Sequence, residues 1–146
     1  MSIISIASKA SVSRGLEYYE NKNVIFWSQV NENVYTGYVK GSLDEPYYVT
    51  IDIEHPKKST CNCPHAEGKV RVCKHKVALY FTIFSEEAER LLEEIRMTEI
   101  EEEEKYSSRL DEIEMYVDSL SEDELRTHLI NALMEIEELY ENEDRW

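Results

Sequence analysis

All three cysteines of the chain and two of its four histidines lie within one short stretch, CNCPHAEGKVRVCKH, at residues 61–75. Cys61 and Cys63 are separated by one residue, and side chains with this spacing point to the same side of an extended backbone. Cys73 and His75 repeat the spacing after a loop that contains a glycine. Two such pairs joined by a loop supply the four ligands that a tetrahedral structural zinc site requires. The sequence therefore predicts one structural Zn²⁺ bound by these four residues.

Two other interpretations of these residues remain: the cysteines could be buried for packing, and another histidine could be the fourth ligand. Cysteine is often buried for packing alone, although this stretch is polar and rich in lysine, which disfavours such packing. His65 is the rival of His75 for the fourth position, and its other interpretation is a solvated loop side chain. An odd number of cysteines excludes a fully paired disulfide framework. Because four protein ligands leave no position for a catalytic water, we expect no enzyme activity.

Size and hydropathy limit the class of protein. A chain of 146 residues suits one domain or a domain with an appendage. Its N-terminal sequence lacks the features of a signal peptide. The longest apolar run is far shorter than the ~20 residues that cross a bilayer. We therefore expect a soluble cytoplasmic protein without a membrane partner, in a reducing compartment where clustered thiols bind metal.

Charge divides the chain into two parts. Residues 1–80 carry ten lysines and arginines against eight acidic residues, a net charge of +2. Residues 81–146 carry six against twenty-three, a net charge of −17. With the strand and helix patterns below, this predicts a zinc-binding module at residues 1–84 and an acidic helical extension at residues 85–146.

The apolar pattern of the first part predicts an α+β fold. A short N-terminal helix follows from Val12, Leu16 and Tyr19, and Asn21 or Asn23 could end it in a left-handed turn. A helix is also expected directly after Cys73. Alternating and β-branched residues predict a small antiparallel sheet with strands at 24–30, 34–39 and 47–53, lengthened by 59–63.

The acidic extension contains no glycine or proline and reads as helical. We expect an interruption at Glu101–Glu104, where like charges repel each other. Ser121 and Glu124 have the spacing of a capping box, which predicts a new helix there. Amphipathic helices usually bury their apolar face in their own chain, and a homo-oligomer formed through these helices is the alternative. The expected helices span about 86–104, 107–119 and 122–142.

The ligand stretch carries a family resemblance. Its two halves, CNCP and CKHKVALY, resemble the ligand motifs of the SWIM zinc finger, in the form found in stand-alone microbial proteins. Upstream, SRGLEYYENKNV is similar to a segment that often precedes these fingers in prokaryotic proteins, although Lys22 stands where glycine is frequent. The resemblance covers about residues 10–84. It implies a ββα-type zinc module that contacts DNA or proteins and has no catalytic activity of its own. The ligands that it implies are Cys61, Cys63, Cys73 and His75.

Basic residues are concentrated on the same segment. Residues 57–76 carry six of them against one acidic residue, Glu67, a net charge of +5. Because the whole chain is acidic, we expect an interaction module that mediates protein–protein contacts within a larger assembly. The alternative is a DNA- or RNA-binding finger that uses this segment and is autoinhibited by the acidic tail. The candidate contacts are Lys57, Lys58, Lys69, Arg71, Lys74 and Lys76.

Overall fold

The structure is a computed structural model that describes residues 2–143. It divides into two compact units, one that ends at Arg96 and one that begins at Met97. The first unit holds the sheet and the ligand stretch, and the second is helical. The fold class is α+β, as the sequence predicts.

The N-terminal helix α1 (Lys9–Glu20) is defined by capping at both ends. Ser8 accepts a hydrogen bond from the backbone N–H of Ser11 at 3.1 Å, as an N-cap serine should. At the other end, the N–H groups of Lys22 and Asn23 donate to the carbonyls of Tyr19 and Tyr18 at 3.0 and 2.9 Å. This is a Schellman motif, which needs a left-handed residue directly after the cap.

That left-handed residue is Lys22, with φ of 54°. Asn21 is the C-cap with φ of −75°, and Lys22 is the one non-glycine residue with positive φ among those that the structure describes. The expectation that an asparagine takes this conformation is therefore wrong. The position is the one where the resembling segments often have glycine, and the backbone geometry explains that preference.

The sheet has four antiparallel strands in the order β1-β2-β3-β4, so each strand pairs with its neighbour in the sequence. The expected strands are confirmed. In β3, Tyr47, Val49 and Ile51 are buried while the residues between them are more exposed, which is the expected alternation. The strands are β1 (Val24–Asn31), β2 (Val34–Val39), β3 (Tyr47–Asp52) and β4 (Thr60–Cys61).

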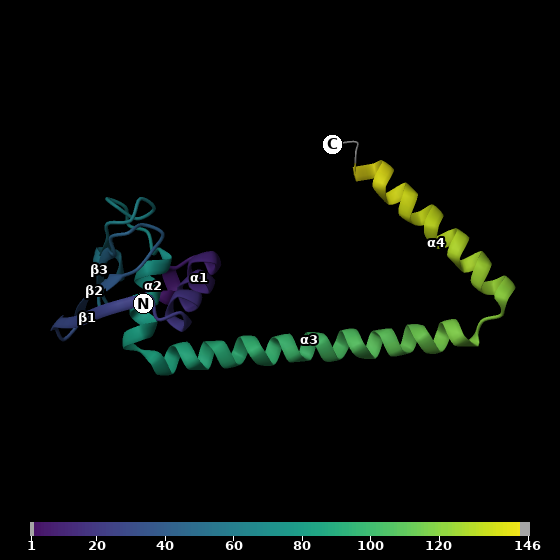
Figure 1. The fold of residues 1–146 in the computed structure, drawn as a ribbon, viewed down its shortest axis with the longest axis horizontal. Coiled ribbons are helices and arrows are strands. Elements are labelled where there is room, and N and C mark those ends of the chain that lie inside the picture. Colours follow the sequence, from purple (N-terminus) through teal and green to yellow (C-terminus); the bar gives the residue numbers. More distant parts are fainter. Residues whose placement is uncertain (1, 144–146) are drawn as a thin grey trace. The chain divides into compact units, whose positions relative to one another are not determined.

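Helix α2 (Lys74–Ile83) is the centre of the first unit (Figure 1). Every residue from His75 to Phe81 is buried, because α2 packs against α1 and against the sheet. Contact with α1 is so close that a Cβ built on Gly15 would lie 2.3 Å from Cγ1 of Val77. Burial of each large apolar side chain contributes about 1.5–3 kcal/mol, so α2 organises the core. Two short 3₁₀ helices, Ile4–Ile6 and Pro56–Lys58, complete the unit.

Helix α3 runs from Ser85 to Ser119 without interruption, so the expected break at Glu101–Glu104 is wrong. These glutamates are exposed to water, where like-charge pairs cost only a few tenths of a kcal/mol and glutamate favours a helix. The first turns of α3 belong to the first unit, because Ala88 is buried in its core. The compact unit thus ends later than the expected boundary after residue 84.

Helix α4 spans Glu122–Glu143 and begins at the expected capping box. The backbone N–H of Ser121 donates to Oε2 of Glu124 at 2.8 Å, and the N–H of Glu124 donates back to Oγ of Ser121 at 3.4 Å. Despite their length, neither α3 nor α4 is apolar enough to cross a membrane, and the same holds for every other described helix.

Replacement of Lys22 by glycine should stabilise the protein by about 0.5–1 kcal/mol. The left-handed conformation costs a residue with a Cβ roughly 1–2 kcal/mol, and glycine removes this cost. The greater entropy of glycine in the unfolded chain offsets about half of the stabilisation. The measurement is the midpoint of urea unfolding at a fixed metal concentration. Asn21→Gly is the matched control, because Asn21 has an ordinary φ and should show no gain. A lower midpoint for Lys22→Gly would contradict the assignment.

Candidate metal centre

Two segments bring the ligand pairs together. Cys61 ends β4, and Cys63 lies in the turn that follows, where its carbonyl accepts hydrogen bonds from the N–H groups of Ala66 and Glu67 at 3.0 and 2.9 Å. Cys73 is the N-cap of α2 with an extended backbone, and His75 lies in the first turn of that helix. Strand pairing of β4 with β3 and packing of α2 on the sheet therefore position the two pairs.

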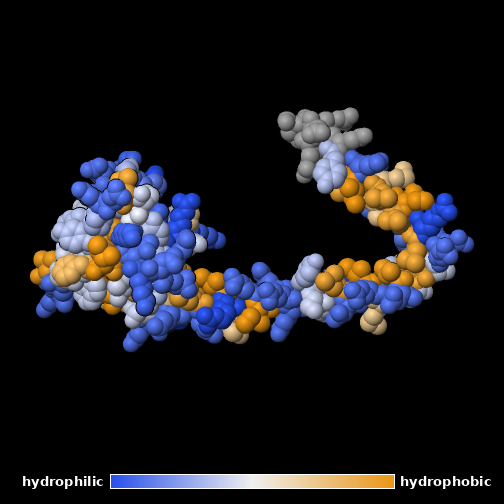
Figure 2. Space-filling view, viewed as in Figure 1, coloured by the Kyte–Doolittle hydropathy of each residue, from blue (hydrophilic) through white to orange (hydrophobic). Residues whose placement is uncertain are grey.

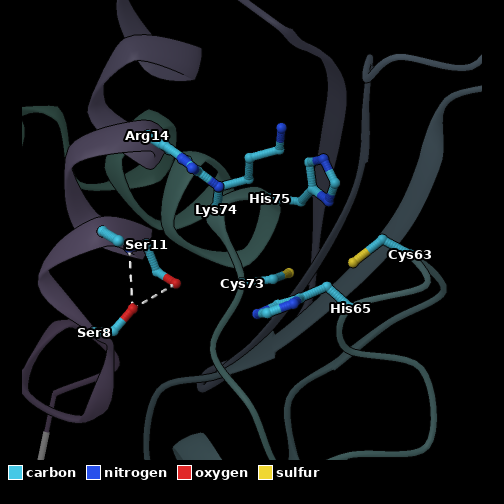
Figure 3. A pocket seen from close by; sticks show the side chains of 9 residues that line it. Ser8, Ser11, Arg14, Cys63, His65, Cys73, Lys74 and His75 are labelled. Atoms are coloured by element: carbon cyan, nitrogen blue, oxygen red, sulfur yellow. Dashed lines mark hydrogen bonds between the residues drawn. The ribbon is translucent and has the colours of Figure 1, made fainter. Parts of the chain in front are cut away.

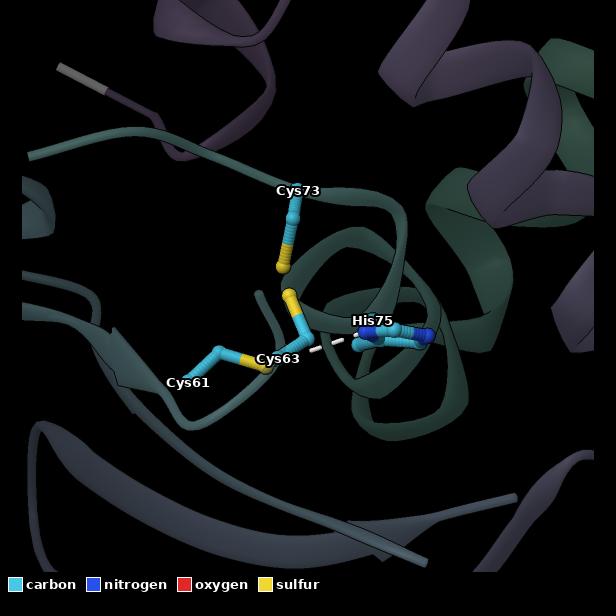
Figure 4. A group of neighbouring side chains, drawn as sticks. All are labelled: Cys61, Cys63, Cys73 and His75. Atoms are coloured by element: carbon cyan, nitrogen blue, oxygen red, sulfur yellow. Dashed lines mark hydrogen bonds between the residues drawn. The ribbon is translucent and has the colours of Figure 1, made fainter. Parts of the chain in front are cut away.

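The four side chains converge on one point (Figure 4). Their candidate ligand atoms all lie within 4.8 Å of one another, and all four residues are buried. Sγ of Cys61 lies 3.7 Å from Nδ1 of His75. Tetrahedral bonds of about 2.3 Å to sulfur and about 2.0 Å to nitrogen place such atoms roughly 3.6 Å apart. The spacing thus fits a tetrahedral metal ion, and it is reached with all three cysteines as free thiols.

The thiols differ in their affinity for protons. A hydrogen bond to Cys73, together with burial, raises the pKa of Cys61, and burial raises the pKa of Cys63. The hydrogen bond from Cys61 lowers the pKa of Cys73. A metal ion must displace the protons that the other two sulfurs hold, and metal affinity should therefore fall with acidification.

His75 is oriented by aromatic packing. Its ring stacks on Tyr47 at 4.4 Å between centroids and lies 5.5 Å from the ring of Tyr18. Nδ1 is the nitrogen near the sulfurs, while Nε2 is buried without a hydrogen-bond partner in the described structure. Gly41 leaves room for this stack, since a Cβ there would lie 2.3 Å from the Tyr47 ring. Aromatic packing, rather than a hydrogen bond at Nε2, therefore holds the outer edge of the ring.

Lys76 is the residue that sequence reasoning misplaced. It was expected among the candidate contacts of the basic segment, but its side chain is only 1% exposed, and that expectation is wrong. Its ammonium donates to the carbonyls of Ser59 at 2.7 Å and Arg71 at 2.8 Å. Burial lowers the pKa of Lys76, and charge interactions with the three cysteine sulfurs oppose this effect. Only its place directly after His75 could have signalled a role inside the site.

The remaining basic residues stay at the surface. Lys57, Lys58, Lys69 and Arg71 are exposed, and Lys74 is half-buried with its ammonium 4.4 Å from the centre of the Tyr18 ring. His65 is exposed and is not part of the four-residue cluster.

Two neighbouring cavities of about 310 and 430 Å³ lie between α1 and the ligand loop, and both are lined by Ser8, Ser11 and His65. Figure 3 shows His65, Arg14 and Lys74 around the first. Lys57 and Arg71 line the second. We refer to the two cavities together as the basic groove.

Removal of the metal should unfold at least residues 55–84. Apparent binding energies of structural zinc in finger peptides are about 10–16 kcal/mol, which is as large as the whole stability of a typical domain at about 5–15 kcal/mol. The measurement is the melting temperature and the far- and near-UV circular dichroism before and after chelation. Unchanged spectra and melting temperature would show that the ion has no structural role.

Two histidine variants control this experiment. His75→Ala should lose most of its bound metal, because it removes a ligand, whereas His65→Ala should keep one metal per chain. Metal content measured by native mass spectrometry tests both variants. Loss of the metal by His65→Ala and its retention by His75→Ala would identify His65 as the fourth ligand.

Comparison with known proteins gives one match. The family model described as SWIM zinc finger matches residues 47–84, which span β3, β4, all four clustered residues and α2. Searches of curated proteins and of solved structures gave no match. The matched segment agrees with the motif resemblance and with the convergence of three cysteines and one histidine. Residues 47–84 of this chain match the SWIM zinc finger and contain a Cys₃His cluster whose ligand atoms could hold one metal ion.

Proposed function

We propose that the centre holds one Zn²⁺ and that the ion is structural. Three thiolates and one imidazole form a donor set typical of closed structural zinc sites. The proposal is supported by the four clustered ligand atoms, since four protein ligands leave no position for a water nucleophile. This closed set supports the proposal of a non-enzymatic role. Elemental analysis of the purified protein tests the identity of the metal, and any other ion at one equivalent would contradict it.

We further propose that the protein is an interaction module that binds a protein partner through its C-terminal helices. The observation that carries this proposal is an exposed apolar stripe on each helix. In α3, Leu110, Ile113 and Val117 recur at helical spacing and are 41–43% exposed. In α4, the stripe includes Leu129 and Ile136, with exposures of 62% and 46%. Figure 2 shows apolar side chains gathered along both segments, and such surfaces mark interaction sites.

Charge favours a basic partner over a second copy. Helix α4 contains eight acidic residues and one arginine, so its apolar stripe is bordered by negative charge. Two copies would bring like charges together, whereas a basic amphipathic helix would complement both the stripe and its borders. The partner that fits is therefore a protein segment with an apolar face and an excess of lysine and arginine.

The double variant Leu129→Asp/Ile136→Asp should lose its partner. It places two more charges on the stripe of α4, where they would be desolvated on binding. Met134→Asp is the matched control, because at 100° per residue Met134 lies on the opposite face of α4. The measurement is affinity capture of the full-length protein from its source lysate, followed by quantitative mass spectrometry.

Capture of the same proteins by the double variant and the wild type would exclude the stripe of α4 as the binding surface. Light scattering measures the oligomeric state of the purified wild type and of the double variant as a second test. A stable dimer that the double variant dissociates would show that a second copy, rather than a basic partner, covers the stripe.

A second candidate function is binding of nucleic acid in the basic groove. The observation that favours it is the composition of the lining, because no acidic residue lines either cavity in a protein with a net charge of −15. Serine hydroxyls and cationic side chains are the groups that contact phosphates most often. The acidic helices oppose this function by repelling phosphate.

Replacement of both Lys57 and Arg71 by glutamine should weaken DNA or RNA binding and lower its salt dependence, by about one unit of logarithmic slope for each lost phosphate contact. Fluorescence anisotropy with labelled oligonucleotides at several salt concentrations measures both effects. The control is Lys22→Gln/Lys40→Gln, which removes two exposed lysines that do not line the groove.

Truncation after Arg96, at the end of the compact unit, should raise this affinity if the acidic helices compete with phosphate. Absence of binding by the full-length and the truncated protein at low salt would rule out the nucleic-acid function.

A further inference from the structure

Lys76 combines two properties that are rarely found together. It is the largest of the fully buried side chains, and its charge is not compensated by a carboxylate, because no described acidic group forms an ion pair with it. Burial of an ammonium is costly unless nearby groups of opposite charge or hydrogen-bond acceptors compensate for it. The compensating groups around Lys76 must therefore come from the metal centre and its backbone.

The hydrogen bonds of Lys76 connect the two ligand segments. One acceptor is the carbonyl of Ser59 at 2.7 Å, two residues before Cys61. The other is the carbonyl of Arg71 at 2.8 Å, two residues before Cys73. A single ammonium thus joins the chain that enters the first cysteine pair to the chain that enters the second pair. The Ser59 hydroxyl extends this connection into the sheet, since it accepts from the N–H of Asp52 at 3.0 Å.

The charge of the centre complements that of Lys76. Three thiolates around one divalent ion leave a net charge of −1, and the neutral histidine adds nothing. The ammonium of Lys76, which bonds to carbonyls two residues before each cysteine pair, brings the sum to zero. Charge interactions in a buried environment are much stronger than at the surface, so the position of Lys76 matters more than that of the exposed lysines.

We propose that Lys76 is a positioning residue of the metal centre, which holds the two cysteine-bearing segments together and neutralises the Cys₃His group. This inference rests on the proposal that the centre holds zinc. It assigns to Lys76 a function that the other lysines of the segment lack, and it predicts that the affinity for zinc depends on this one cation.

Lys76→Met keeps the length of the side chain and removes the charge and both hydrogen bonds. It should lower zinc affinity 10–100-fold, as removal of groups that support metal ligands does. The measurement is competition for Zn²⁺ with a chromophoric chelator. Lys69→Met is the matched control, because it removes the same charge from an exposed lysine of the same segment, and it should change the affinity less than threefold. Equal affinities of Lys76→Met and the wild type would overturn the proposal.

A double-mutant cycle separates the charge effect from packing. Cys63→His converts the centre to Cys₂His₂, whose net charge with Zn²⁺ is zero. Lys76→Met should then cost several-fold less affinity in the Cys63→His background than in the wild-type background. An equal loss in both backgrounds would overturn the neutralising role of Lys76.

A measurement on the wild type covers the case in which Lys76→Met does not fold. In the zinc-loaded protein, NMR should detect slowly exchanging ammonium protons on Lys76 with hydrogen bonds to carbonyls, unlike those of Lys74. Rapid exchange at Lys76 would overturn the proposal. If the wild type binds no zinc at all, the proposed zinc centre fails instead, so the two failures are distinguishable.

Discussion

The closure of residues 61–75 on themselves is the constraint on which the rest of the first unit depends. This segment contains only one strand residue, Cys61, at its start and the first two residues of α2 at its end, so regular structure alone gives it few backbone hydrogen bonds. A metal ion held by the four convergent side chains would supply the cross-link that such a loop needs. Once Cys61 and His75 are fixed relative to each other, β4 lies on the sheet and α2 starts in the correct direction to fill the core.

Residue spacing made this centre predictable. The one-residue gaps at Cys61–Cys63 and Cys73–His75 are local properties of the chain, and the geometry of strand and helix start turns them into ligand pairs. The strands were equally predictable from the sequence, because the alternation of residue types along β3 reflects burial on one face of a sheet. The capping box before α4 was also predictable, because its hydrogen bonds follow from the spacing of Ser121 and Glu124.

Features that depend on tertiary context were not predictable in the same way. The side chain of Lys76 reads as a surface cation, and only the converging carbonyls of Ser59 and Arg71 reveal it as part of the interior. The unbroken α3 shows that a local effect can also be overestimated. The repulsion expected at Glu101–Glu104 is weak in water, and no glycine or proline interrupts the helix. Local sequence patterns indicate the type of secondary structure and the spacing of ligand residues. Burial of a charged side chain depends instead on segments that are distant in the sequence.

The two units present surfaces of opposite character, and this contrast bears on what the protein can bind. On the functions proposed above, the basic groove would attract a polyanion, while the acidic helices would repel one and attract a basic apolar segment. One partner cannot satisfy both surfaces unless it carries both kinds of charge. Binding to the groove should weaken steeply with salt, because it rests on charge alone. Binding to the stripes of α3 and α4 should resist salt better, because burial of Leu129 and Ile136 contributes a hydrophobic component that ions do not screen.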